Sequence, residues 1–420
     1  MRLHLRRDTK NLLWINSLHL LILNNMAADY IETYIDNMNF YTNRGYADTK
    51  MVEDMVLEMT TTTMSLKYKI PNEVTTRDFH SIIGQITAIA HGQCPATDLG
   101  LDFQDLDVRN WSAPARMDLA LTYQCNNNCY FCYMGGPRKT KELTKEQWVW
   151  VLNKLWEAGI PQVVFTGGEP TLYKDLPYLV DHAQEFVTGL VTNGTKLTSK
   201  LCKQFKDSSL DYIQVTIESD RSKIHDKMVG RNGAWQETTA GIAHAKLEGL
   251  DVVTNTTLMR DNFKDAVPLM FFLHDLGIKT MSFNSLICSG KGILCKDNIN
   301  RLTERELRDT LVEIRNACKS IPMEVQWYTP TCYKNLNPLD FGFGIKNCSA
   351  AKFNMTIEPD GRVIPCQSWL HEDCGNILKD DWASIWNSKV AQKARQSHAK
   401  DECANCEWIQ QCEGSCPLDK

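Results

Sequence analysis

The stretch that decides the fold of this chain is Leu121-Thr-Tyr-Gln-Cys125-Asn-Asn-Asn-Cys129-Tyr-Phe-Cys132. Its spacing, Cys-x3-Cys-x2-Cys, places three thiolates on one short loop. A [4Fe–4S] cluster has four iron corners and is held by cysteine thiolates. Three cysteine ligands leave one iron open, which suits the binding of a substrate or cofactor better than simple electron storage.

Other interpretations of the three cysteines remain open at this point. Structural zinc usually takes its ligands in pairs and ends with four. A disulfide explains less, because three is an odd number and the loop is too short for two bridges. Three unrelated thiols in so tight a group would be a coincidence. The spacing alone favours an iron–sulfur cluster over zinc.

A second motif, Phe165-Thr-Gly-Gly-Glu-Pro170, overlaps the end of the apolar run Val163-Val164-Phe165. Glycines at the end of a strand let the backbone approach a ligand closely. Glu169 offers a carboxylate to an ammonium group of such a ligand. A lone Gly-Gly-Glu-Pro would indicate only a turn, but here it accompanies the cysteine loop.

Together the two motifs resemble the radical S-adenosylmethionine (SAM) superfamily over about residues 115–290. The resemblance implies a catalytic [4Fe–4S] cluster on Cys125, Cys129 and Cys132, with SAM chelating the open iron. It implies reductive cleavage of SAM to a 5′-deoxyadenosyl radical, which abstracts hydrogen from an unactivated carbon. An electron donor such as ferredoxin or flavodoxin is then an expected partner. The residues that the resemblance places around SAM are Phe131, Gly167, Gly168, Glu169, Pro170, Thr192, Asn193, Thr216, Glu218 and Arg231.

Two of these positions depart from the family pattern. The fourth-strand motif is usually Ser-x-Asp, whereas here Thr216 and Glu218 keep the polar chemistry and change the contact distances. The family often has an arginine just before the glycine that matches Gly230, but Val229 stands there. Arg231 is the expected substitute as the partner of the SAM carboxylate.

The rhythm of strands and helices agrees with this resemblance. Strand patterns occur at 117–123, 162–166, 189–193, 212–217, 252–258 and 280–286. Helix patterns between them occur at 144–159, 197–207, 237–249 and 265–276. Alternation of this kind predicts an α/β fold with a parallel sheet. Six repeats suit a partial (β/α)6 TIM-like barrel, the usual radical SAM fold, with its ligand site at the carboxyl ends of the strands.

A second set of cysteines lies near the carboxyl end. Cys348 and Cys366 flank Gly361, and Cys403-x2-Cys406-x5-Cys412-x3-Cys416 follows. Over about residues 332–420 this pattern resembles SPASM, a loop-rich extension of radical SAM enzymes that binds auxiliary [4Fe–4S] clusters. A zinc ribbon is the alternative for the last four cysteines taken alone.

The SPASM resemblance implies two groups of ligands. One is Cys332, Cys348, Cys366 and Cys416, and the other is Cys403, Cys406 and Cys412 with a downstream ligand that no residue of this sequence matches. Cys374, Asp419, a water or a substrate atom are the candidates for that position, with Cys374 the less favoured because it lies outside the family spacing. The cysteines expected to be free thiols are Cys94, Cys202, Cys288, Cys295 and Cys318.

The first 110 residues pose a separate question. Residues 12–23 predict two apolar strands, and helices are expected at 24–35, 47–59 and 76–91. A hairpin followed by three helices resembles the RiPP recognition element, a winged-helix-like module that captures the leader peptides of ribosomally made natural products. A small packing domain that binds no peptide is the alternative. A leader peptide would add a strand to the edge of the hairpin.

Composition limits the remaining possibilities. Sixteen cysteines in 420 residues, if they ligate clusters, require a reducing compartment, so we expect a cytoplasmic protein. The net charge of −5 and the lack of a basic tract argue against a nucleic-acid partner. The apolar run at 18–23 is too short to span a membrane. The predicted domains are 1–110, the recognition-like module; 111–320, the radical SAM core; and 321–420, the SPASM-type domain.

The leading functional hypothesis is maturation of a peptide or protein, in an oxidoreductase-like reaction that forms a crosslink or thioether. Formylglycine formation in sulfatases is disfavoured, because Gln367 stands where those enzymes carry an aspartate after the cysteine that matches Cys366. A small-molecule enzyme acting on a tetrapyrrole side chain is the alternative. A non-catalytic iron–sulfur scaffold is a third possibility, which the paired motifs disfavour.

Overall fold

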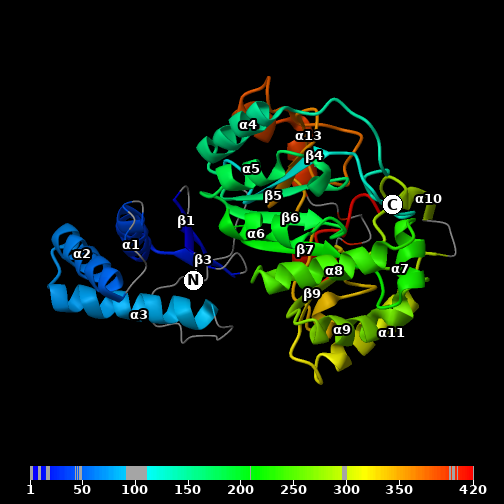
Figure 1. Cartoon of the computed structure of the whole chain (residues 1–420), viewed down its shortest axis with the longest axis horizontal. Coiled ribbons are helices and arrows are strands. Elements are labelled where there is room, and N and C mark those ends of the chain that lie inside the picture. Colours follow the sequence, from blue (N-terminus) through cyan, green and yellow to red (C-terminus); the bar gives the residue numbers. More distant parts are fainter. Residues whose placement is uncertain are drawn as a thin grey trace. The chain divides into compact units, whose positions relative to one another are not determined.

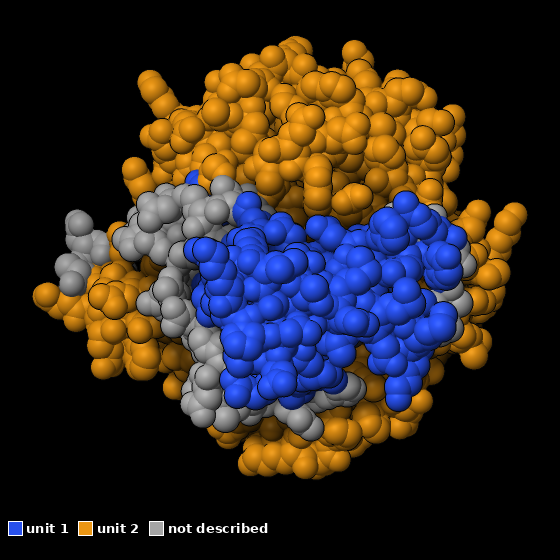
Figure 2. All heavy atoms as spheres, turned by 90° about the vertical axis from the view of Figure 1, so that its left-hand side faces the viewer, with its two compact units in different colours: residues 1–111 blue, residues 112–420 orange. Residues whose placement is uncertain are grey.

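A computed structural model describes most of the chain, with gaps of uncertain placement. The described residues are 3–7, 11–15, 19–42, 44, 46, 50–90, 111–208, 210–295, 300–396, 399, 403 and 405–419. They fall into two compact units, 1–111 and 112–420 (Figure 2). Cys94 and the expected boundary segment before Trp111 lie outside the described residues.

The first unit combines a small antiparallel sheet with three helices. The strands are β1 (Leu3–Arg7), β2 (Asn11–Ile15) and β3 (His19–Leu23), paired in the order β1-β2-β3. The helices are α1 (Asn25–Thr42), α2 (Lys50–Tyr68) and α3 (Asn72–Ala90). The hairpin and the three helices were predicted from the sequence, whereas β1 was missed because Leu3–Arg7 carries two arginines and a histidine.

Burial of one face of each helix holds this unit together. Leu13 and Ile15 on β2 pack with Tyr30 and Ile31 on α1 and with Ile86 on α3, all at most 1% exposed. Asn24 caps the first turn of α1, because its Oδ1 accepts a hydrogen bond of 2.8 Å from the Ala27 N–H.

The second unit is built on one sheet of ten strands. In sheet order they are β10 (Glu324–Trp327), β9 (Thr280–Ser285), β8 (Val252–Leu258), β7 (Tyr212–Thr216), β6 (Val187–Thr192), β5 (Gln162–Gly167), β4 (Arg116–Thr122), β11 (Asn354–Ile357), β12 (Arg362–Ile364) and β13 (Gly375–Asn376). All pairs from β10 to β11 are parallel, and β12 and β13 add antiparallel pairs. The predicted α/β class with a central parallel sheet is confirmed.

Helices connect the parallel strands, and Figure 1 shows the strands in the interior of the unit with the helices outside them. The main helices are α4 (Lys145–Glu157), α5 (Leu176–His182), α6 (Ser199–Asp207), α7 (Ser222–Val229), α8 (Ala234–Leu247), α9 (Ala266–Asp275) and α11 (Glu304–Ala317). Shorter ones are α10 (Gly292–Cys295), α12 (Trp382–Trp386), α13 (Lys389–Arg395) and α14 (Ile409–Cys412). In the described part of the chain, no helix has the length and apolar character needed to cross a bilayer.

Local sequence explains why these helices form where they do. Thr144 and Gln147 make a capping box at the start of α4. One face of α4 then buries Trp148 and Leu152, which are at most 1% exposed. α5 and α7 were not predicted, because seven and eight residues are too few to show a helical period.

The sheet is curved, and its concave face brings distant strands together. β4 and β10 stand six places apart in the sheet order. In a flat sheet that would separate them by roughly 29 Å, at about 4.8 Å per strand. Yet burial lowers the pKa of Arg116 on β4, whereas Asp118, Tyr212 and Tyr328, the last directly after β10, raise it. Tyr328 is therefore within electrostatic reach of Arg116, which indicates that the sheet curls, as a partial barrel does.

Candidate functional site

The cysteine loop begins directly after β4 and is held by the end of β5. The Gly168 N–H donates to the Thr122 carbonyl at 2.7 Å, and the Glu169 N–H donates to the Gln124 carbonyl at 2.8 Å. A Cβ on Gly168 would lie 2.4 Å from that second carbonyl oxygen. A Cβ on Gly167, whose φ is +143°, would lie 2.3 Å from the first. The two glycines are therefore needed for the close approach of β5 to the cysteine loop.

The three thiols of the loop lie within electrostatic reach of one another. Burial raises the pKa of Cys125 to about 11, with smaller contributions that include one from Cys132. Burial also raises the pKa of Cys129, and the negative charges of Cys132, Glu218 and Cys125, when ionised, raise it by smaller amounts. The Asn127 N–H points at the Cys125 sulfur, 3.4 Å away. Partly exposed thiols on one loop, with an N–H aimed at sulfur, are a donor set that fits a [4Fe–4S] cluster.

Among the described residues, no three histidine, cysteine, aspartate or glutamate side chains are arranged to hold a single metal ion. Each thiolate of an iron–sulfur cluster binds a different iron, so the ligands of a cluster are not expected to meet at one point.

Glu169 is fully buried and is fixed by donors from two strand ends. Its Oε1 accepts hydrogen bonds from the Thr171 N–H at 3.0 Å, the Thr171 hydroxyl at 2.5 Å and the Thr192 hydroxyl at 2.7 Å. Its Oε2 accepts one, from the Asn193 N–H at 2.8 Å. A carboxylate oxygen has two lone pairs, so Oε2 keeps one for a further donor.

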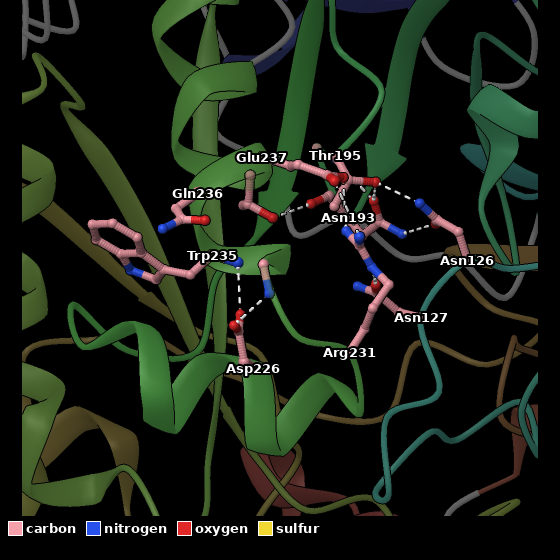
Figure 3. Close-up of polar contacts among 12 residues, drawn as sticks. Asn126, Asn127, Asn193, Thr195, Asp226, Arg231, Trp235, Gln236 and Glu237 are labelled. Atoms are coloured by element: carbon pink, nitrogen blue, oxygen red, sulfur yellow. Dashed lines mark hydrogen bonds and ion pairs between the residues drawn. The ribbon is translucent and has the colours of Figure 1, made fainter.

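Asn193, directly after β6, links that carboxylate to the cysteine loop, and Figure 3 shows Asn193 beside Asn126 of that loop. Its Nδ2 donates to Asn126 Oδ1 at 2.8 Å and lies 3.9 Å from the Cys125 sulfur. The Asn126 amide in turn donates to the Thr195 hydroxyl at 2.8 Å. The carboxyl ends of β4, β5 and β6 are thereby joined into one hydrogen-bonded network.

Arg231 lies beside the same network, already paired within the protein (Figure 3). Its Nε donates to Asn127 Oδ1 at 2.8 Å, and its two Nη atoms pair with Glu237 at 3.2 and 2.8 Å. A SAM carboxylate would have to compete with Glu237 for this guanidinium, which the sequence did not reveal.

Glu218, just after β7, is fully buried, and only one of its oxygens has a partner. Oε2 accepts from the Thr257 N–H at 2.9 Å, whereas Oε1 has none in the described structure. Burial raises the pKa of Glu218 to about 8. The neighbouring His225 accepts the Glu218 N–H at its Nδ1, 3.1 Å away, and burial lowers the pKa of His225 to about 4. Both side chains are therefore mainly neutral near pH 7.

The remaining positions expected around SAM surround the same loop. Phe131 packs against the buried cluster of Met228, Met259, Leu286 and Cys295, with its ring centroid 5.4 Å from that of Tyr130. Thr216 ends β7, two residues before Glu218. Pro170 begins a short 3-10 helix, Pro170–Leu172, whose cap is Glu169.

Three of the carboxyl-terminal cysteines lie together. Burial raises the pKa of Cys366, and Cys348 and Cys416 raise it further. Burial raises the pKa of Cys416 to about 12, with a contribution from Cys348. These are three of the four residues that the SPASM resemblance groups into one cluster. The fourth residue of that group is Cys332. The carbonyl of the preceding residue, Thr331, accepts a hydrogen bond of 3.5 Å from the thiol of Cys412, which belongs to the second group.

The candidates for the missing ligand have other partners. Burial raises the pKa of Cys374 to about 11, and its neighbours include Ser388 and Arg395. Asp419 accepts from the Cys288 thiol at 3.1 Å and forms an ion pair of 2.9 Å with Arg301. In the second group, the Cys406 N–H donates to the Cys403 carbonyl at 3.0 Å.

Sequence reasoning missed several polar residues that lie within electrostatic reach of one another although they are far apart along the chain. They are Arg116, Asp118, Tyr133, Tyr212, Tyr328 and Lys346. The Tyr133 hydroxyl donates to Gln367 Oε1 and so joins the residue after Cys132 to the residue after Cys366. No local motif marks these positions, because curvature of the sheet brings them together.

Comparison with known proteins adds two family matches. The model described as the radical SAM superfamily matches residues 119–273, and the model described as the SPASM iron–sulfur cluster-binding domain matches residues 348–407. Two curated proteins are similar in sequence. Fe-coproporphyrin III synthase of Methanosarcina barkeri is 27% identical, covering 70% of this chain and 81% of that protein. The AdoMet-dependent heme synthase of Oleidesulfovibrio alaskensis is 25% identical, covering 70% and 80%.

Solved structures show a similar fold. Streptococcus suis SuiB bound to its precursor peptide SuiA has a TM-score of 0.67 at 14% identity, covering 99% of this chain and 94% of that one. The protein anSMEcpe with bound AdoMet has a TM-score of 0.58 at 15% identity, covering 72% and 88%. The likeness to SuiB thus includes the first unit, which lies outside both family matches.

Proposed function

Because the chain carries a radical SAM domain followed by a SPASM iron–sulfur domain, we propose that it is an enzyme that modifies a peptide or protein by SAM-dependent hydrogen abstraction. When bound, the [4Fe–4S] cluster and SAM supply the 5′-deoxyadenosyl radical for that chemistry. The work of the chain itself is to hold the cluster, orient the cofactor and keep the substrate next to it.

The geometry supports definite roles for the residues at the strand ends. Cys125, Cys129 and Cys132 hold the cluster, and β5 fixes the position of their loop. Oε2 of Glu169 accepts a hydrogen bond from the methionine ammonium, for which it keeps a lone pair. Asn193 keeps that carboxylate and the cysteine loop in a fixed relation. Glu218 offers a buried polar group to the ribose side of the same site.

The carboxyl-terminal cysteines hold one or two auxiliary [4Fe–4S] clusters in this proposal. Cys348, Cys366 and Cys416 are already neighbours, and Cys332 is the expected fourth ligand. Such clusters accept an electron from the product radical or bind the substrate. A low-potential donor such as ferredoxin or flavodoxin supplies the first electron, which agrees with a reducing, cytoplasmic location.

The observation that carries the peptide assignment is the likeness to SuiB over the whole chain, first unit included. The three strands and three helices of the first unit are compatible with the hairpin and three helices expected of a recognition element. Its strand β3 pairs only with β2 in the described residues, and a leader strand would add to the other edge of β3.

One observation favours a second candidate, a reaction on a tetrapyrrole side chain. The curated relatives named above are a coproporphyrin and a heme synthase, and they match 70% of this chain. Their similarity does not extend over the whole chain, whereas the likeness to SuiB does. The peptide substrate therefore remains the main proposal.

The decisive experiment offers both substrates to the same reconstituted protein. Anaerobic enzyme with SAM and dithionite is incubated with short peptides encoded beside its gene or with iron coproporphyrin III, and mass spectrometry follows each substrate. Loss of hydrogens from a peptide, with matching 5′-deoxyadenosine, supports the main proposal. Decarboxylated porphyrin with unchanged peptides would replace it by the second candidate. No SAM cleavage at all would refute both.

A further inference from the structure

Four side chains from distant parts of the second unit lie within electrostatic reach of one another. Arg116 lies on β4, Tyr212 on β7, Tyr328 just after β10, and Lys346 on the segment that leads to Cys348. The Lys346 ammonium lies 5.5 Å from the centre of the Tyr328 ring. Burial lowers the pKa of Arg116, whereas Asp118, Tyr212 and Tyr328 raise it more strongly, so both phenols lie within electrostatic reach of its guanidinium. We call these four residues the concave cluster.

The positive charge of the concave cluster is only partly balanced. Arg116 Nε and Nη2 pair with the two oxygens of Asp118 at 2.8 and 3.2 Å, and Asp118 is fully buried. Nη1 of Arg116 has no hydrogen-bond partner in the described part of the chain. The Arg116 side chain is 34% exposed, so a ligand can reach this side chain. Nζ of Lys346 has neither a hydrogen bond nor a carboxylate within ion-pair distance among the same residues. Two cations thus face one carboxylate.

A hydroxyl donor lies beside these cations. Tyr212 accepts a hydrogen bond of 3.1 Å from Gln162 Nε2, which leaves its own O–H free to donate. Burial raises the pKa of Tyr212 to about 12, so this proton is retained near neutral pH. Two cationic groups and a phenol within one partly dry region match the needs of an incoming carboxylate, because charge-assisted hydrogen bonds are strong there.

The concave cluster lies close to both sets of cysteines. Tyr133 follows Cys132, and its hydroxyl donates to Gln367, which follows Cys366. Asp118 and Arg116 are among the electrostatic neighbours that shift the pKa of Tyr133, after burial and Cys132. A group held by Arg116 and Lys346 would therefore sit near the loops that bear the proposed radical and auxiliary clusters.

We propose that Arg116 and Lys346, with Tyr212, bind a carboxylate of the substrate and so place the neighbouring carbon for hydrogen abstraction. This inference rests on the proposed function and adds the chemical class of substrate. The carboxylate belongs to an aspartate, a glutamate or the carboxyl end of a peptide, or to a propionate if the substrate is a tetrapyrrole. A role of Lys346 in balancing the charge of an auxiliary cluster is the competing explanation.

The test measures binding rather than turnover. Titration calorimetry on anaerobic, cluster-loaded protein with SAM compares each probe with its uncharged form. The peptide arm uses the gene-adjacent peptide against the version with Asn, Gln and a carboxamide in place of its acids. The porphyrin arm uses iron coproporphyrin III against its tetramethyl ester. We expect the acid form of one probe to bind about tenfold more tightly or better, as for a desolvated ion pair.

Three variants locate that preference. In Lys346→Gln the ratio of the affinities for the acid and neutral probes should fall below about threefold. The tenfold ratio expected of the wild type corresponds to about 1.4 kcal/mol. The double change Arg116→Gln with Asp118→Asn should lower it similarly without leaving Asp118 unpaired. Exposed Lys334→Gln is the matched control and should keep the full preference.

Equal binding of acid and neutral forms to the wild type would overturn the inference. So would a Lys346→Gln protein that keeps the preference while the reduction potential of an auxiliary cluster moves. Formation of 5′-deoxyadenosine with dithionite, measured without either probe, tests the proposed function separately from the carboxylate site. Its absence would sink the proposed function, whereas its presence without a charge preference would sink only the carboxylate site.

Discussion

Two carboxylates, Glu169 and Glu218, are completely buried at the carboxyl ends of β5 and β7, and their hydrogen bonds differ sharply. Glu169 accepts four hydrogen bonds, three of them at one oxygen. Glu218 accepts one, and its other oxygen has no partner in the described structure. Hydrogen bonds favour the charged form of an acid, whereas burial disfavours it. The two residues therefore respond differently when the charge is removed.

Glu169→Gln is expected to weaken SAM binding by about tenfold or more, because a charge-assisted hydrogen bond to the methionine ammonium is worth about 1.5–3 kcal/mol. Calorimetric titration of the cluster-loaded protein with SAM measures the effect. Exposed Glu146→Gln is the matched control. Iron content should stay unchanged, and an unaltered affinity would mean that Glu169 serves the fold alone.

Glu218→Gln is expected to stabilise the cluster-free protein near neutral pH. Burial raises the pKa of Glu218 from 4.5 to about 8. Its favourable contribution to the free energy of unfolding is therefore complete below pH 4.5 and is lost as the pH rises to 8. The neutral amide escapes this loss, which amounts to roughly 3 kcal/mol at pH 7. The gain in melting temperature over wild type should therefore grow between pH 5 and pH 7.

Glu157→Gln, exposed on α4, is the control for that series and should show no such trend. A Glu218→Gln protein that is less stable at every pH would show instead that the ionised carboxylate is the native form.

Single residues were predictable from the sequence where their partners are close in the chain. The three cysteines and Gly167–Pro170 form short motifs that the sequence marks directly, and their role as a site stays a prediction. Arg116 and Lys346 are within electrostatic reach of each other, but their separation along the chain hides this proximity. Arg231 was predicted as a partner for SAM, but its bond to Glu237 depends on the placement of α8.

At the scale of elements, the strands of the second unit were predicted well because buried parallel strands form continuous apolar runs. β10, β11, β12 and β13 were missed because they have only four, four, three and two residues. In the first unit, β1 was missed although it contributes a structural anchor. Arg7 at its end binds Asp29 of α1 at 2.5 Å.

Asp29→Asn is expected to loosen the first unit. Burial raises the pKa of Asp29, but hydrogen bonds from Lys67, Tyr68 and Arg7 lower it by a larger amount, so that the net value is about 2. Its contribution is therefore present above pH 4 and is lost as the pH falls towards 2. At pH 7 the variant should lose roughly 2 kcal/mol of local stability. Hydrogen exchange of the α1 amides measures this loss.

Exposed Asp36→Asn, on the same helix, controls for the change of charge. Equal exchange rates in the two variants would show that the three donors do not stabilise the unit through Asp29.

At the scale of the whole molecule, the sequence indicated an α/β core with a cysteine-rich tail but not that the tail extends the sheet. β10 continues it beyond β9, and β11 pairs with β4 on the other side. These pairings unite segments at opposite ends of the second unit, which is why local patterns do not reveal them.

Changing Cys125, Cys129 and Cys132 together to alanine is expected to abolish 5′-deoxyadenosine formation and leave iron in the tail. Anaerobic wild type should load about three clusters, and the variant should lose about four irons. Iron and sulfide assays with chromatography of the nucleoside check both points. Cys202→Ala, at a buried thiol of α6, should behave as wild type. Normal SAM cleavage in the triple variant would contradict the site assignment.

The pairing of β4 with β11 also has a consequence for synthesis of the protein. Asp118 and Asn354, which contact each other across this pair, are 236 residues apart. At about 5–20 residues per second, the ribosome needs roughly 10 to 50 s to cover that interval. Throughout this time the strand that leads into Cys125 has an unpaired edge on the nascent chain. We therefore expect the yield of active protein to depend on protection of this edge from aggregation as well as on the supply of iron and sulfide.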